Sequence, residues 1–250
     1  FLIYTSEGSE TGPRLASFLG IESGTSMPSE RYDYLVRWGS ARRVDYIPRE
    51  FTLNKRTALC KSTNKLRSLE VMSEAGVPVP PFSTNWGNLE FPMVERRTSH
   101  MEGRDIKLLM QPYDISGGAD YFTQYIQKSK EFRVHVFKSE IVKISQKKRR
   151  ETDPDYDPVC WNYNSGWRFL QPDCEPPGLQ QAIPAVNSHG LDFGAVDIMI
   201  DPDGQPYVLE VNTAPGCYET TLEMYGGLIA EAINLDDYPG MSAVDWPEDD

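Results

Sequence analysis

Three side chains could supply oxygen ligands to a metal: Asp197, Glu210 and Asn212. They occur on two apolar segments, which are joined by a short polar stretch. The segments are DFGAVDIMI and YVLEVNTAPG, and the Pro- and Gly-containing DPDGQP between them predicts a hairpin. If residues 202–205 form its loop, Asp197 lies directly opposite Glu210, with Cβ atoms about 5 Å apart. Strand alternation puts Asn212 on the face of Glu210. Two carboxylates and an amide suit Mg²⁺ or Mn²⁺ carrying phosphates, and do not suit zinc.

The alternative is a solvated hairpin with ordinary surface acids. The neighbouring residues argue against it, because they are too apolar for a surface ribbon: Val196, Ile198, Ile200, Val208 and Val211. Carboxylates that extend from buried strands need a cation to offset their desolvation. The metal site is therefore the favoured interpretation.

Composition restricts the class of protein. The chain has 250 residues and a net charge of −12, which argues against nucleic acid as the main partner. No stretch approaches the roughly 20 apolar residues of a membrane span. Cys60, Cys160, Cys174 and Cys217 lack CxxC spacing, which favours reduced thiols over a disulfide framework or zinc site. We therefore expect a cytoplasmic protein without a membrane partner.

Apolar periodicity predicts a mixed α+β (α/β) chain that begins with a short βαβ segment. A helix capped by Ser62 or Thr63 is expected next, ended by Gly76 and the Pro-rich VPVPP. Strands are expected at FPMVERR, IKLLM, EFRVHVF and EIVKISQ, and helices after Leu179 and Leu222. The predicted divisions are an N-terminal lobe (1–60), a small lobe (61–126), a large lobe with the metal site (127–235) and an acidic tail (236–250).

Five motifs in one order resemble the ATP-grasp ligases, in particular the RimK-like carboxylate-amine ligases. An Asn-Lys pair opens a helix before a "gipvP" turn, a Gly-containing loop follows a strand of the type "fPvvvK", and a hinge precedes an acid-then-Arg strand. The closing signature is "D(x)nEvNtsPG". The matching segments lie within residues 33–233 and are TNKLRSLEVMSEAGVPVP, FPMVERRTSHMEGRDI, FTQYI, EFRVHVF and the Asp197, Glu210, Asn212 and TAPG set.

The resemblance implies an ATP-grasp fold, in which two α+β lobes grip ATP after a short pre-ATP-grasp segment. It assigns nucleotide phosphates to Lys65 and Arg96, with a loop containing Gly103 above them. Gln124, Tyr125 and Ile126 are expected to line the adenine pocket, and Glu131 to contact the ribose or a metal. Asp197, Glu210 and Asn212 are expected to hold two Mg²⁺ or Mn²⁺ ions.

Arg133 is the residue expected to stabilise an acyl phosphate and a tetrahedral intermediate. Some ligases of the superfamily carry another Arg just before the metal Asp, where this chain has Ala195 and Val196, and Lys147 or Arg149 is expected to compensate. Two further ambiguities stay open. Arg97 fits the phosphate role as well as Arg96 does, and WNYNSGW offers Asn162 and Asn164 either as substrate contacts or as an ordinary turn. His135 is read as a structural or pocket-lining histidine.

The predicted function is an ADP-forming carboxylate-amine ligase that makes an amide bond through an acyl phosphate. Its partners are ATP, a small-molecule, peptide or protein substrate with a carboxylate, and an amine co-substrate; the oligomeric state is left open. Two alternatives share the nucleotide residues. One is an ATP-grasp kinase that phosphorylates a small molecule, and the other is a non-catalytic ATP-binding module.

Overall fold

The computed structural model describes residues 1–26, 31–44, 48, 51–98, 106–150, 159, 161, 166–236 and 239–240. Gly103, Asn162 and Asn164 lie outside the described residues, as does most of the acidic tail. The chain divides into two compact units. Unit 1 contains residues 1–60, 190–194 and 212–250, and unit 2 contains residues 61–189 and 195–211. The proposed large lobe, 127–235, therefore differs from this grouping at residues 190–194 and after residue 211.

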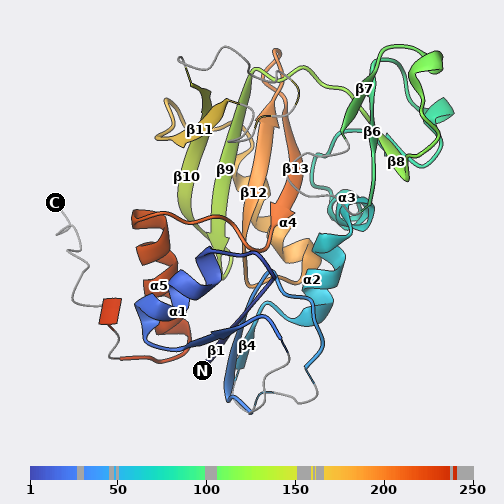
Figure 1. Ribbon diagram of the computed structural model, residues 1–250. Helices are drawn as coiled ribbons and strands as arrows, with labels where there is room; N and C mark the ends of the chain where they lie inside the picture. Colours follow the sequence, from blue (N-terminus) through green and yellow to red (C-terminus); the bar gives the residue numbers. More distant parts are fainter. Residues whose placement is uncertain are drawn as a thin grey trace. The chain divides into compact units, whose positions relative to one another are not determined.

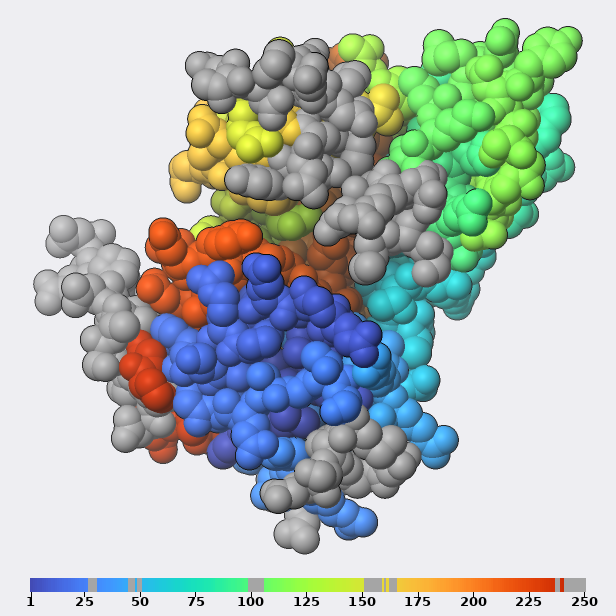
Figure 2. Space-filling view, viewed as in Figure 1, coloured from blue at the N-terminus to red at the C-terminus, as the bar shows by residue number. Residues whose placement is uncertain are grey.

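Unit 1 is built on a parallel sheet with the order β2-β1-β3-β4. Its strands are β1 (Leu2–Thr5), β2 (Glu22–Gly24), β3 (Tyr34–Trp38) and β4 (Phe51–Leu53). Helix α1 (Thr11–Leu19) joins β1 to β2 and packs against α5 (Thr220–Ala232). The predicted βαβ start is thus confirmed. In Figure 2 the N-terminal segment (blue) lies against the segment after Asn212 (orange to red), the two parts of the chain that unit 1 combines.

Two sheets carry unit 2 (Figure 1). The smaller one is antiparallel and has the order β5-β8-β6-β7, with β5 (Phe82–Ser83), β6 (Met93–Arg96), β7 (Lys107–Leu109) and β8 (Tyr121–Gln124). The larger has the order β11-β10-β9-β12-β13, with β9 (Lys130–Phe137), β10 (Glu140–Arg149), β11 (Trp167–Leu170), β12 (Phe193–Ile200) and β13 (Pro206–Asn212).

Helix α2 (Arg56–Thr63) leads into α3 (Lys65–Glu74), and α4 (Ala182–His189) follows a 3-10 turn (Leu179–Gln181) and packs against β9. Two more 3-10 turns are Trp86–Asn88 and Pro112–Asp114. The even residues of β9, Phe132, Val134 and Val136, are fully buried, as the sequence pattern predicts. Among the described residues, no helix combines the length and apolar character needed to cross a membrane.

The cap of the Lys65 helix differs from the prediction. Ser62 and Thr63 belong to α2, and the N-cap of α3 is Asn64, whose side chain accepts a hydrogen bond from Arg67 N–H at 3.0 Å. Asn64 has an extended backbone, which ends one helix and starts the next. The prediction that Ser62 or Thr63 caps this helix is therefore wrong. The true cap makes Lys65 the first helical residue.

The turn between β12 and β13 is one residue shorter than predicted. Asp201 N–H donates to Gln205 O at 3.1 Å, and Gly204 N–H donates to Asp201 O at 3.1 Å. Gly204 has φ of +86°, the left-handed conformation that closes a three-residue hairpin loop. The predicted pairing of Asp201 with Pro206 is therefore wrong. Counting from this turn no longer places Asp197 directly opposite Glu210.

Asn54 ties the end of β4 to the start of β12 within unit 1. Its buried side-chain amide donates to Phe193 O at 3.0 Å and accepts from Asp192 N–H at 2.8 Å and from Phe193 N–H at 3.2 Å. Its own N–H donates to Asp192 Oδ2 at 2.6 Å. Phe193 then stacks on Trp38, with ring centroids 5.3 Å apart. Asn54 therefore anchors the strand that continues to Asp197.

We expect Asn54→Ala to lower the free energy of unfolding by about 3 kcal/mol, because three backbone groups, two of them buried, lose their partners. Urea unfolding measures this. Asn234→Ala is the matched control, since Asn234 has a similar positive φ of 52° but is exposed, and it should cost less than about 1 kcal/mol. Equal losses in the two variants would show that backbone conformation, and not the hydrogen bonds, carries the effect.

Candidate active site

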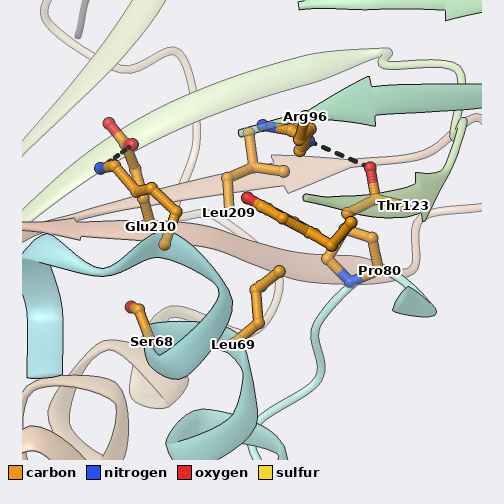
Figure 3. A pocket seen from close by; sticks show the side chains of 9 residues that line it. Ser68, Leu69, Pro80, Arg96, Thr123, Leu209 and Glu210 are labelled. Atoms are coloured by element: carbon orange, nitrogen blue, oxygen red, sulfur yellow. Dashed lines mark hydrogen bonds and ion pairs between the residues drawn. The ribbon is translucent and has the colours of Figure 1, made fainter. Parts of the chain in front are cut away.

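Lys65 and Glu210 form an ion pair that joins α3 to β13. The distance from Lys65 Nζ to Glu210 Oε2 is 2.7 Å, and a dashed line at Glu210 marks the pair in Figure 3. Both side chains are partly exposed. Lys65 lowers the pKa of Glu210 to about 2, although burial and the nearby Asp197 act in the opposite direction. The backbone N–H of Lys65 also donates to Thr98 O at 3.0 Å. The start of α3 is thus bonded to the segment after β6.

Asp197 on β12 is buried and bound by two cations. Arg133 on β9 donates two hydrogen bonds to it, Nε to Oδ1 at 2.7 Å and Nη2 to Oδ2 at 2.8 Å. Lys147 on β10 reaches the same Oδ2 at 3.2 Å. Burial alone would raise the pKa of Asp197, but Arg133 and Lys147 together hold it well below its usual range. Asp197 is therefore charged at neutral pH.

Glu131 is the second buried carboxylate of this cluster. It accepts from Lys147 Nζ, and its other oxygen lies 2.8 Å from Lys128 Nζ. Burial opposes the charge on Lys147, but Asp197 and Glu131 raise the pKa of that lysine. Both oxygens of Glu131 are thus paired with lysines. Its predicted contact with a ribose or a metal stays a prediction.

Arg96 lies in the pocket beside the Lys65–Glu210 pair. Its Nε donates to Thr123 Oγ1 at 3.1 Å, and it shares the pocket with Ser68 and Leu209 (Figure 3). Arg97, the alternative in the sequence, lines neither of the two pockets described in unit 2, and its guanidinium lies near Gly118. The geometry favours Arg96 for a nucleotide phosphate.

A second pocket adjoins the first and contains the predicted adenine segment. Gln124, Tyr125 and Ile126 line it, together with Met199 and other apolar side chains. The Gln124 side chain is already bonded, however, because its Nε2 donates to Glu90 O at 3.0 Å and to Pro92 O at 2.9 Å. The N–H groups of Gln124 and Tyr125 also have backbone partners. These two N–H groups are therefore not available to an adenine base. The backbone carbonyl oxygens of this segment and Ile126 are left to contact it.

The donor set suits Mg²⁺ in its chemistry. Asp197 and Glu210 supply carboxylate oxygens, and Asn212 ends β13 two residues after Glu210. The side-chain amide of Asn212 is buried, and its nitrogen has no hydrogen-bond partner among the described residues. An unpaired buried amide at the end of β13 fits a position that a ligand completes. Nowhere in the described part do three or more His, Cys, Asp or Glu residues gather as a metal cluster.

The two candidates to replace the missing arginine behave differently. Lys147 is buried and bound to Asp197, whereas Arg149 is exposed and pairs across the sheet with Trp167. His135 is buried on the same strand face as Arg133. Burial, with added repulsion from Arg133 and Lys143, lowers its pKa to about 3, so it is neutral.

Two residues that contact this cluster were missed in the sequence. Lys128 binds Glu131 and lies over the Trp161 ring, with its Nζ 4.7 Å from the centroid. Phe169 on β11 lies against both Arg133 and Lys147. Lys128 had a weak signal, since it precedes Glu131 by three residues in a strand-like segment. Phe169 had none, because its place depends on how β11 pairs with β10.

Comparisons with known proteins point to one superfamily, although no family model matches the chain. A D-alanine–D-alanine ligase of Hydrogenovibrio crunogenus is 27% identical over 231 residues, covering 80% of this chain and 71% of the relative. A probable alpha-L-glutamate ligase of Legionella pneumophila is 22% identical over 185 residues, covering 66% of this chain and 60% of the relative. The chain thus spans less than two thirds of the second relative.

The solved structures give the same result for the fold. The ATP-grasp ligase PsnB, complexed with a minimal precursor, has a TM-score of 0.65 at 13% identity, over 92% of this chain and 98% of that one. At this identity the likeness concerns the fold. Together with the sequence relatives, it confirms the predicted α+β class and the ATP-grasp fold.

Proposed function

We propose that the protein is an ATP-dependent, ADP-forming ligase that joins a carboxylate to an amine. The observation that carries the proposal is the pairing of Asp197 with Arg133 and Lys147, two cations that line neither nucleotide pocket. Cations beyond the nucleotide are what an acyl phosphate needs, because negative charge develops there as it forms and as the amine attacks. The relatives' names, an amino-acid ligase and a ligase complexed with a precursor, favour an amino acid or peptide as the acid.

Each group has a role in this scheme. Lys65 and Arg96 hold the ATP phosphates, and the apolar pocket at Tyr125 and Ile126 holds the base. A carboxylate oxygen of the substrate attacks the terminal phosphorus and ADP leaves. The amine then attacks the acyl carbon, loses a proton, and phosphate leaves. Arg133 keeps Nη1 for the oxyanion, since Asp197 uses Nε and Nη2.

Asp197, Glu210 and Asn212 would hold Mg²⁺, which supplies charge neutralisation to the phosphate oxygens. We propose two ions, because two carboxylates flank the site.

The described cysteines form no disulfide, which supports a reducing, cytoplasmic location.

The direct test is ADP and phosphate release with ATP and Mg²⁺ against a panel of amino acids and short peptides, offered singly and in pairs. We expect release that needs both an acid and an amine, and a product whose mass is the sum of the two minus water. Mass spectrometry of the products reads this out. A stable phosphate ester from one substrate would point to a kinase, and ATP binding without turnover on any substrate would support a binding module.

Glu210→Gln tests the carboxylate beside the phosphates. The variant keeps shape and hydrogen bonding but loses the charge, so we expect turnover to fall at least about 100-fold. Steady-state kinetics with circular dichroism as a folding check measure this. Asp203→Asn removes a charge from the exposed β12–β13 turn and should stay within about twofold of the parent. Comparable activity of Glu210→Gln and the parent would reject this carboxylate as a metal ligand.

Lys65→Met tests the cation of the first pocket. Calorimetric titration should show that MgATP binds about tenfold more weakly, since a charged hydrogen bond is lost. The pKa of Glu210 should rise from about 2 toward 4.5, so the variant should be less stable than the parent above pH 4.5, with the gap closing as the pH falls to about 2. Lys55→Met, an exposed lysine, is the control. Unchanged ATP affinity in Lys65→Met would count against the assignment.

A further inference from the structure

Phe169 lies beside the two cations that hold Asp197. On the sheet it pairs with Lys147, which in turn pairs with Glu131. The centre of its ring is 5.4 Å from Lys147 Nζ and 4.6 Å from Arg133 Cζ. These distances are typical of cation–π contacts. One ring therefore orients both cations.

These contacts leave part of the Phe169 ring exposed to solvent. Phe169 remains 42% exposed, whereas Trp167, two residues earlier on the same face of β11, is only 8% exposed. Trp167 is covered by Trp161, stacked on it with centroids 3.8 Å apart. A phenyl ring that is open to solvent and next to charged groups offers an apolar surface for a ligand.

One donor of Arg133, Nη1, is not bound to Asp197. Arg133 uses Nε and Nη2 on Asp197, and its side chain is 17% exposed, so Nη1 can receive an anion. An acid bound there would place its carboxylate on Arg133 and the carbon chain next to it within reach of Phe169. Arg133 and Phe169 together thus match a molecule with a carboxylate at one end and an apolar group nearby.

We propose that Phe169 is a specificity-determining residue that receives the apolar or aromatic side chain of the acid substrate. The proposal rests on the function proposed above and adds the class of acid, a carboxylate with an apolar or aromatic group a few bonds away. Small acids bind without using the ring. Acids with charged side chains bind more weakly, because the charged group would lose its water against the Phe169 ring.

The test compares binding of 3-phenylpropanoate with that of propanoate, by NMR titration of the whole protein without ATP. We expect the aromatic acid to bind about tenfold more tightly, and Phe169→Ala to reduce this preference to less than about threefold. Leu170→Ala is the matched control, since Leu170 is the exposed neighbour on the opposite face of β11 and should keep the preference. The neutral 3-phenylpropanamide should bind weakly to all three proteins.

Two results would overturn the proposal: equal affinity of the parent for the two acids, or a preference that survives in Phe169→Ala. A parallel assay with ATP, Mg²⁺ and hydroxylamine separates it from the proposed function, because an acyl phosphate is trapped as a hydroxamate. Phe169-dependent binding without any hydroxamate would reject the ligase and keep the binding site. Hydroxamate formation at equal rates from both acids in the parent would keep the ligase and reject the role of Phe169.

Discussion

A buried carboxylate is the constraint on which the larger sheet of unit 2 depends. Asp197 is 3% exposed on a strand whose eight residues are all buried, and an unpaired charge there would cost several kcal/mol. Arg133 and Lys147 offset that cost. Because they come from the two strands next in line, β9 and β10, the order β10-β9-β12 is also the order that neutralises Asp197. Strand pairing and charge pairing are satisfied by one arrangement.

The local charge of this site is opposite to that of the chain. The chain carries −12, but the described cluster combines three carboxylates, Asp197, Glu131 and Glu210, with four cations, Lys65, Lys128, Arg133 and Lys147. Three negative and four positive charges leave +1, and Arg96 in the adjoining pocket makes it +2. An acidic protein can thus attract the phosphates of ATP, since buried charges are screened less than those on the surface.

The sequence predicted the elements well because their signals are local. The alternation in EFRVHVF and the helical pattern after Leu179 are patterns between neighbours in the chain. The strands that carry Asp197 and Glu210 were predicted from the same kind of pattern. The errors arose where one residue decides a boundary or a register. Asn64 ended a helix where Ser62 or Thr63 had been expected to start one, and Gly204 in a left-handed conformation shortened the turn by one residue. Lys128 and Phe169 were missed because their contacts require the tertiary pairing of distant strands.

The same contacts explain why the cations are held before any substrate arrives. Without a partner, Arg133 and Lys147 would repel each other in a poorly hydrated site, and they would be mobile. Asp197 fixes both, and Phe169 covers one side of each. A site whose donors are already oriented pays less entropy when charge develops on a ligand. The buried acid is therefore better understood as the group that positions the two cations than as a stabilising ion pair.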